Sequence, residues 1–185
     1  MRRTPGNLVA VLALVAALVA TVLLVAPAHA ASVRVTKSEA NKALRTFGAS
    51  IENPAVIRPF SGSPWDGRHF CGEDWHTVLV SPVEGGDASF TKNDAAVILD
   101  AISVSFVLNG SPLASERTKI KSVPDPSQFG FVNAYFFNQG RVLSPDELAV
   151  GQHQLSVSII DSSGTPLLVD QITFFIDAAG TGACL

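Results

Sequence analysis

The chain has 185 residues and a formal net charge of −3 at pH 7, from 13 Lys and Arg and 16 Asp and Glu. Two basic and no acidic residues lie in residues 1–30, so residues 31–185 hold eleven basic and sixteen acidic side chains, a charge of −5. This acidity argues against nucleic acid as a partner, because phosphate binding needs a basic surface. The remaining length is enough for one domain with a buried core.

The start of the chain has the pattern of a secretory signal peptide. Arg2 and Arg3 precede an uncharged apolar run over residues 8–25, and small residues frame the segment's end at 28–30. We expect residues 1–30 to be removed by cleavage, which predicts a protein secreted or held in the cell envelope. The alternative is an uncleaved membrane anchor, because 18 apolar residues lie at the lower end of the length that spans a bilayer.

A short amphipathic helix is predicted over residues 37–47. Thr36 and Glu39 have the spacing of a capping box, apolar residues follow at helical spacing, and Gly48 is placed to end the helix. This helix either docks on the domain that follows or contacts a partner, and we favour docking.

Proline and glycine then punctuate the chain, which is typical of an extended linker or of a lid over the edge of a domain. The residues that carry this interpretation are Pro54, Pro59, Gly62 and Pro64. We therefore divide the exported chain into residues 31–70, with the helix and the linker, and residues 71–185, with a β domain and a tail tethered by a disulfide.

Beyond the linker the hydrophobic period changes to two, which predicts strands. In chain order the predicted strands are residues 75–80, 96–108 as two strands split near Asp100, 113–123, 129–138, 154–160 and 167–176. Turns are expected at residues 84–87, at Asn109-Gly110, at Gly151 and at 161–164. Short strands with turns between them indicate an all-β sandwich or barrel, and a parallel α/β sheet is disfavoured because helices do not alternate with the strands.

Two of these strands predict which residues form the core. Val104, Phe106 and Leu108 share one face of their strand, because side chains alternate along a strand. Leu155, Val157 and Ile159 share a face of theirs in the same way. We expect both sets to point between the two sheets.

Residues 76–177 resemble the bacterial immunoglobulin-like domains found as modules of secreted and cell-surface proteins. The matching pieces, in the expected order, are Ser81-Pro82 with Gly85-Gly86, residues 102–113, 148–157, 161–164 and 172–177. The resemblance implies an antiparallel Greek-key β-sandwich that serves for spacing or binding. It carries over no catalytic residue and leaves the partner open.

Both cysteines, Cys71 and Cys184, lie in the predicted exported part. Two cysteines in an exported chain most often pair with each other, so an intramolecular disulfide is predicted. The alternatives are two free thiols or a bridge between molecules.

Residues 69–76 hold the densest group of side chains that could carry chemistry. In an extended strand His69, Cys71 and Glu73 share one face. Asp74 and His76 share the other. A transition-metal site needs three or four converging ligands, so it requires a bend in this segment. The favoured alternative is a disulfide neighbourhood with solvated polar residues.

A second candidate metal site lies in residues 84–94. Glu84, Asp87, Asn93 and Asp94 offer the oxygen atoms that calcium prefers. An ordinary acidic turn explains the same residues and is the interpretation that we favour.

Aromatic residues alternate over residues 129–137. One face carries Tyr135 and Phe137 with Phe129 and Phe131, and the opposite face is also apolar. An exposed row led by Tyr135 and Phe137 could stack on sugar rings or on an apolar partner. A core face is the favoured alternative, in which case the strand is covered on both sides, by the predicted helix on one of them.

Signatures of acyl-transfer enzymes are weak. The chain has no Gly-x-Ser-x-Gly elbow. A Cys-His pair formed by Cys71 with His69 or His76 conflicts with the expected disulfide.

The function that the sequence favours is a secreted, non-enzymatic immunoglobulin-like binding or structural module. It needs no cofactor and meets a protein or a glycan at the cell envelope. The alternatives are a metal- or calcium-dependent binding protein and a small secreted hydrolase.

Overall fold

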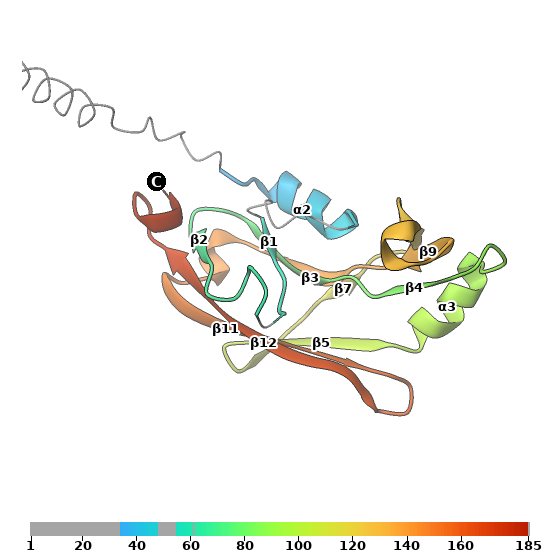
Figure 1. The fold of residues 1–185 in the computed structure, drawn as a ribbon. Helices are drawn as coiled ribbons and strands as arrows, with labels where there is room; N and C mark the ends of the chain where they lie inside the picture. Colours follow the sequence, from blue (N-terminus) through green and yellow to red (C-terminus); the bar gives the residue numbers. More distant parts are fainter. Residues whose placement is uncertain (1–33, 48–54, 61, 185) are drawn as a thin grey trace, which may run out of the picture. The chain divides into compact units, whose positions relative to one another are not determined.

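The computed structural model describes residues 34–47, 55–60 and 62–184. The predicted signal peptide, Gly48 and Pro54 lie outside the described residues. Within them the structure is mostly β, with three sheets and two short α helices, α2 (Lys37–Arg45) and α3 (Lys92–Asp100) (Figure 1). The prediction of a β-sandwich preceded by a short N-terminal helix is confirmed, and α3 is an additional helix.

The strands form three sheets. Sheet A has the order β1 (Val56–Ile57), β3 (His76–Val80), β10 (Gln139–Leu143), β7 (Glu116–Arg117). Sheet B has the order β2 (His69–Cys71), β12 (Pro166–Asp177), β11 (Gly151–Ile160), β5 (Ser103–Leu108), β6 (Ser111–Leu113). Sheet C has the order β4 (Val83–Gly86), β9 (Asn133–Phe136), β8 (Lys121–Ser122). Short 3-10 turns are η1 (Pro126–Phe129), η2 (Pro145–Glu147) and η3 (Gly182–Cys184).

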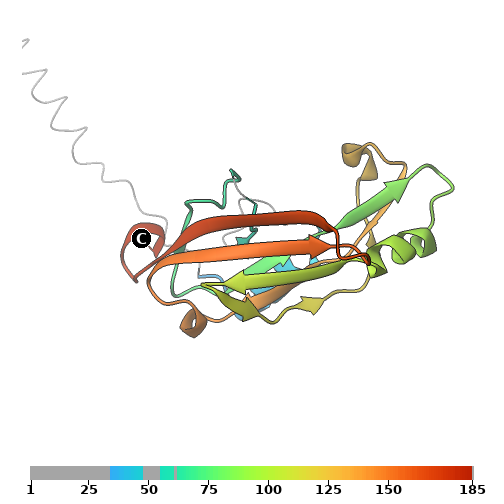
Figure 2. The same cartoon turned by 90° about the horizontal axis from the view of Figure 1, so that it is seen from below.

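Neighbouring strands are antiparallel, apart from the parallel pairs β1–β3 and β2–β12. Figure 2 shows β12, β11 and β5 side by side as the centre of sheet B. The hairpin between β5 and β6 turns at Asn109 and Gly110, whose φ angles are 50° and 79°. Both values are positive, as the Asn-Gly signal predicted.

The main core lies between sheets A and B. Sheet A contributes Ile57, Val78, Val80 and Leu143, and sheet B contributes Phe70, Phe106, Leu155, Val157, Ile172, Phe174 and Ile176. The partly buried Val104, Leu108 and Ile159 pack against this core. The predicted faces of β5 and β11 are therefore confirmed.

Helix α2 covers the other face of sheet A. Ala43 and Leu44 pack against Val56 and Leu79, so all five residues of β3 are buried. The predicted capping box is present, and the helix ends at Arg45, two residues earlier than expected. Docking of the helix, the favoured alternative, is thus what the structure shows.

The segment predicted as a linker contains a strand. Val56 and Ile57 are fully buried, and they pair in parallel with Thr77 and Val78 of β3. Two residues are too short to show a period, so neighbouring β3 rather than local sequence determines this strand. The domain boundary at residue 70 stays a prediction.

Helix α3 corrects the first of the two strands predicted over residues 96–108. Thr91 and Asp94 form a capping box, and Ala95 and Leu99 are fully buried one helical turn apart. The β-branched Val97 and Ile98 favoured a strand in the sequence, but both are exposed on the helix.

Three other sequence predictions also differ from the structure. The turn expected at 84–87 is largely strand β4, which pairs with β9. The strand expected at 113–123 is divided among β6, β7 and β8, and the strand expected at 129–138 shortens to β9 after η1. Sheet partners set these limits, because each short strand extends only over the residues that pair with its neighbour.

Candidate binding pocket beside the N-terminal helix

A pocket of about 340 Å³ lies between the end of α2 and the segment that joins β7 to β8. It is lined by Arg45, Glu116, Arg117, Thr118, Lys119 and Lys121. Four of these six residues are basic and one is acidic, in a chain whose residues 31–185 carry a net charge of −5. Positive charge is therefore concentrated at this pocket, although the net charge of residues 31–185 is negative.

The fully buried side chain of Asn138 holds the two walls of the pocket together. Its amide nitrogen donates to the carbonyl oxygens of Leu44 (2.7 Å) and Thr46 (3.1 Å), at the end of α2. Its backbone exchanges hydrogen bonds of 2.8 Å with Thr118 on the other wall, and its side-chain oxygen accepts from Ser81 at 2.7 Å. These bonds satisfy carbonyls that the helix end leaves unpaired.

The four basic side chains of the pocket make different contacts. The guanidinium of Arg117 donates to Asp100 (2.7 Å) and to the carbonyl of Leu99, and its carbon lies 3.8 Å from the centre of the Phe137 ring. These contacts fix Arg117 as part of the wall. Lys121 donates to the carbonyl of Arg45 at 3.1 Å, at the negative end of the helix.

The exposed side chains of Arg45 and Lys119 complete the rim. The hydroxyl oxygen of Thr118 accepts a hydrogen bond from Asn138, so the hydroxyl hydrogen remains available to a ligand. Ammonium, guanidinium and hydroxyl donors around one hollow can bind an acidic group by charge and hydrogen bonding. They offer no nucleophile next to a base.

Sequence reasoning missed this pocket, although a signal was present. Arg117, Lys119 and Lys121 occupy alternate positions, which places three basic side chains on one face of an extended chain. Arg45 is more than 70 residues away along the chain, so only the docking of α2 adds it to the group.

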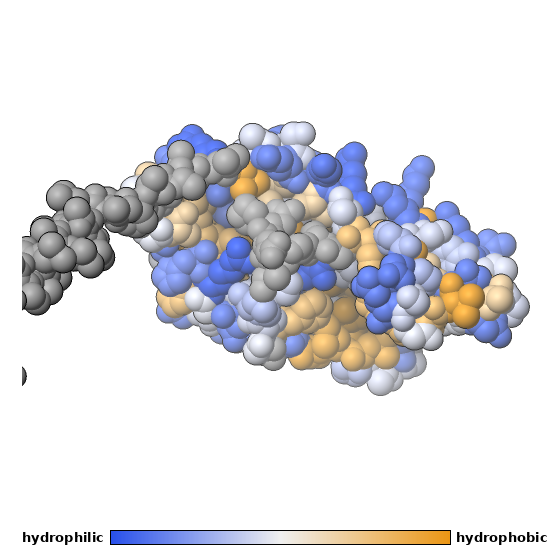
Figure 3. All heavy atoms as spheres, turned by 45° about the horizontal axis from the view of Figure 1, so that its top comes forward, coloured by the Kyte–Doolittle hydropathy of each residue, from blue (hydrophilic) through white to orange (hydrophobic). Residues whose placement is uncertain are grey.

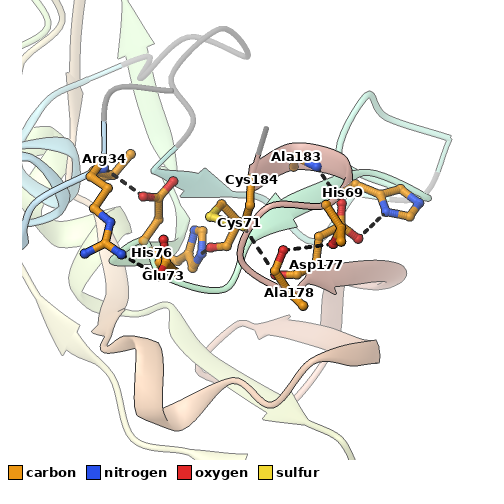
Figure 4. Close-up of a disulfide and its surroundings, with 12 residues drawn as sticks. Arg34, His69, Cys71, Glu73, His76, Asp177, Ala178, Ala183 and Cys184 are labelled. Atoms are coloured by element: carbon orange, nitrogen blue, oxygen red, sulfur yellow. Dashed lines mark hydrogen bonds and ion pairs between the residues drawn. A yellow bond between two sulfur atoms is a disulfide. The ribbon is translucent and has the colours of Figure 1, made fainter. Parts of the chain in front are cut away.

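The residues predicted as transition-metal ligands each have a partner of another kind. His69 Nδ1 lies 2.8 Å from a carboxylate oxygen of Asp177, and Glu73 forms an ion pair with Arg34. Asp74 accepts from the backbone of Val35 at 2.9 Å, and His76 Nε2 lies 3.0 Å from the carbonyl oxygen of Cys71. Figure 4 shows His69 with Asp177 on one side of the disulfide and Glu73 with Arg34 on the other. Over residues 34–47, 55–60 and 62–184, no three His, Cys, Asp or Glu side chains form a group that could hold a metal ion.

The predicted disulfide between Cys71 and Cys184 is present, with the two Cα atoms 4.7 Å apart. It fastens η3 to β2 at the edge of sheet B. Asp177 supports the same junction, because it accepts from the backbone nitrogen of Ala183 and from His69. These two hydrogen bonds, the one from Ala183 being the larger cause, lower the pKa of Asp177 below its ordinary value.

Two of the acidic residues proposed as calcium ligands accept hydrogen bonds from residues close to them in the sequence. Asp87 accepts from the backbone and the hydroxyl of Ser89, and Asp94 accepts from Thr91 at the start of α3. Those hydrogen bonds, with the hydroxyl groups as the first cause, lower the pKa of both carboxylates. Glu84 lies within β4, paired with Tyr135.

Of the aromatic row predicted over residues 129–137, only residues 134–137 are covered on both sides, whereas Phe129 is exposed. Helix α3 covers Tyr135, which is half-buried, and Phe137, which is 0% exposed. Phe47, just after α2, packs with Ala134 and Phe136 on the opposite side. For Phe137 the structure therefore shows the favoured alternative, a core position, and excludes the exposed binding surface; the helix that covers it is α3, which the sequence analysis did not predict.

His153 is separate from the other histidines in its contacts. Its two ring nitrogens lie 2.8 Å from the amide of Asn109 and 2.6 Å from the carbonyl oxygen of Ala149. A neutral ring satisfies both contacts, with Nε2–H donating to Ala149 and Nδ1 accepting from Asn109. The residue thereby joins the β5–β6 hairpin to the start of β11, as a structural element.

Figure 3 views the molecule from the α2 side and shows hydrophilic residues broken by smaller hydrophobic areas. Among the described residues, no helix combines the length and the apolar character needed to cross a membrane.

No family model matches the chain, and no curated protein matches it. Among solved structures it is similar to the cysteine protease inhibitor EhICP2 of Entamoeba histolytica, with 13% identity over 65% of this chain and 95% of that one and a TM-score of 0.33. It is also similar to fibronectin(III)-like modules of CbhA from Clostridium thermocellum, with 15% identity, 60% and 90% coverage and a TM-score of 0.30. A third similar structure is the C-terminal domain of the Streptococcus agalactiae AgI/II polypeptide BspA, with 12% identity, 62% and 46% coverage and a TM-score of 0.33. At this level of identity nothing about activity or partners is transferred.

Proposed function

We propose that this protein is a secreted, non-enzymatic immunoglobulin-like module that binds an acidic group on a protein or glycan of the cell envelope. The observation that carries the proposal is the cationic pocket, in which Arg45, Lys119 and Lys121 surround a hollow of about 340 Å³. Opposite charge at a partner's surface accelerates association and selects the partner.

Two further features support a site of action outside the cell. The disulfide between Cys71 and Cys184 is of the kind that persists in oxidising compartments. The start of the chain has the pattern of a signal peptide, which would direct the protein there.

The test is binding of residues 31–185 to an isolated cell-envelope fraction, measured by co-sedimentation. We expect the protein to sediment with the envelope at low salt and to be released as NaCl rises to about 0.5 M, because salt screens exposed charges. The variant K119E/K121E should lose most of the bound fraction.

The matched control is K37E/K92E, which makes the same change of charge at exposed lysines outside the pocket. Equal loss of binding in both variants would show that net charge, not the pocket, governs capture. Binding that persists at high salt and in K119E/K121E would contradict the proposal.

A further inference from the structure

The loop that follows β1 contains a group of buried polar atoms. Among the described residues, Nε and Nη2 of Arg58, the hydroxyl of Ser63 and the indole Nε1 of Trp65 are buried and make no hydrogen bond. All three residues are half-buried, so these atoms lie beneath the surface and not in the centre of the core. Trp65 and the neighbouring Phe60 pack against the core between the sheets and anchor the loop.

Such a group needs an explanation, because buried polar atoms in native proteins almost always have partners. The cost is greatest for the guanidinium, which is charged, and burial lowers the pKa of Arg58 below its ordinary value. The Trp65 ring, whose centre lies 5.7 Å from the guanidinium carbon, attracts the cation but accepts no hydrogen bond at its edge. The nearby carboxylate of Asp66 accepts from the backbone nitrogen of Thr173.

The identity of the two Arg58 atoms indicates the missing partner. Nε–H and the Nη2 group lie on the same edge of the guanidinium and point in parallel. This pair forms the side-on fork that binds the two oxygens of an oxyanion, with one hydrogen bond to each. The indole N–H and the hydroxyl can also donate hydrogen bonds. Every atom of the group can therefore donate to an anion, and none is limited to accepting.

We propose that Arg58, Ser63 and Trp65 form a binding site for an oxyanion group, a carboxylate or a phosphate, carried by an extracellular ligand. The Arg58 fork binds two oxygens side-on, and the indole of Trp65 and the hydroxyl of Ser63 add donors. Because these atoms are buried, binding requires the side chains of Arg58 and Ser63 to turn outward, while Phe60 and the Trp65 ring stay packed on the core. The site shares no residue with the cationic pocket, so either proposal can fail without the other.

The indole N–H of Trp65 provides a direct readout. The chain has two tryptophans, so the ¹H–¹⁵N spectrum of residues 31–185 contains two indole signals, and W75F assigns the one from Trp65. Sodium acetate and sodium phosphate are titrated separately at pH 7 against sodium chloride of equal ionic strength. We expect the Trp65 signal to shift and saturate with acetate or phosphate and to respond little to chloride. The oxyanion with the lower saturating concentration assigns the group.

Variants separate the fork from simple charge. R58Q should abolish the saturating shift, and R58K, which keeps the charge without the fork, should weaken binding by about tenfold. The control R68Q removes a second partly buried arginine of the same segment, and its titration should match that of the unaltered protein. A shift that is equal in chloride, or that persists in R58Q, would overturn the proposal.

A partner within the chain is tested in the same spectra. Glu52 lies outside the described residues and is the acidic residue closest to Arg58 in the sequence before it. If E52Q moves the Trp65 signal in the absence of added anion as R58Q does, the carboxylate belongs to the chain itself and the ligand site is refuted. An unchanged signal in E52Q supports an external oxyanion.

Discussion

Strand β3 of sheet A and strand β11 of sheet B face the same core, but their outer faces differ. All five residues of β3 are buried, because α2 covers the side of sheet A that points away from sheet B. In β11 the buried His153, Leu155 and Val157 alternate with more exposed residues, because neither described α helix covers the outer face of sheet B. Buried residues therefore alternate along a strand with one covered face and are continuous along a strand with two covered faces.

The two sheets are also held in different ways by the segments that pack on them. Sheet B ends at β2, where the disulfide fastens the tail to the strand. Sheet A is held by the packing of α2 and by the hydrogen bonds of Asn138. Removing these features one at a time tests how much of the stability each sheet owes to them.

The largest effect is expected from loss of the disulfide. The bond spans 113 residues, and the chain-entropy model gives about 4–5 kcal/mol as an upper figure for a loop of this length. C71S/C184S should lower the free energy of unfolding in urea by a large part of that amount. The reduced unaltered protein should match the variant, and an unchanged midpoint after verified reduction would contradict this account of sheet B.

Alanine substitutions at neighbouring positions test the two faces directly. L155A should cost about 2–5 kcal/mol, whereas S156A should change stability by less than about 0.5 kcal/mol, because only Leu155 faces the core. In β3, V78A and L79A should both be costly, since one faces sheet B and the other faces α2. Urea unfolding measures all four. A tolerant L79A would mean that α2 does not cover sheet A.

A smaller effect is expected at Asn138. N138A leaves the carbonyls of Leu44 and Thr46 without their donor, which costs about 1–3 kcal/mol if they stay buried. N138D should be at least as damaging, because a carboxylate cannot donate to these carbonyls. Hydrogen exchange of the α2 amides should accelerate in both variants, while that of β11 should not. Equal acceleration in β11 would show that the two sheets are not stabilised separately.

The smallest effect is a dependence on pH at the edge of sheet B. The pKa of Asp177 is lowered in the folded protein by its hydrogen bonds with Ala183 and His69. A carboxylate whose pKa is lowered by folding stabilises the folded protein at pH values above its unfolded pKa, which is about 3.9. This stabilisation is lost as the pH falls through the folded pKa. D177N should therefore melt slightly lower than the unaltered protein at pH 7, and the difference should shrink as the pH falls below the unfolded pKa. A difference that stays constant as the protein is acidified would assign the effect to packing.

The sequence alone determined the features that depend on local chemistry. Asn109-Gly110 gave a hairpin because both residues tolerate positive φ, and Thr36 with Glu39 marked the start of α2. The faces of β5 and β11 were also readable, because strict alternation fixes a one-sided strand. The disulfide was also predictable, since two cysteines in a chain with the pattern of an exported protein most often pair with each other.

Only the tertiary structure decided what depends on contacts between distant segments. Residues 91–100 have both a capping box and β-branched residues, and burial of Ala95 and Leu99 against Phe137 favours the helix. Docking of α2 joins Arg45 to the basic residues of 116–121 and thereby makes the pocket. A local sequence pattern cannot predict these two features. The free energy that favours them comes from apolar surface and hydrogen bonds shared by residues far apart in the chain.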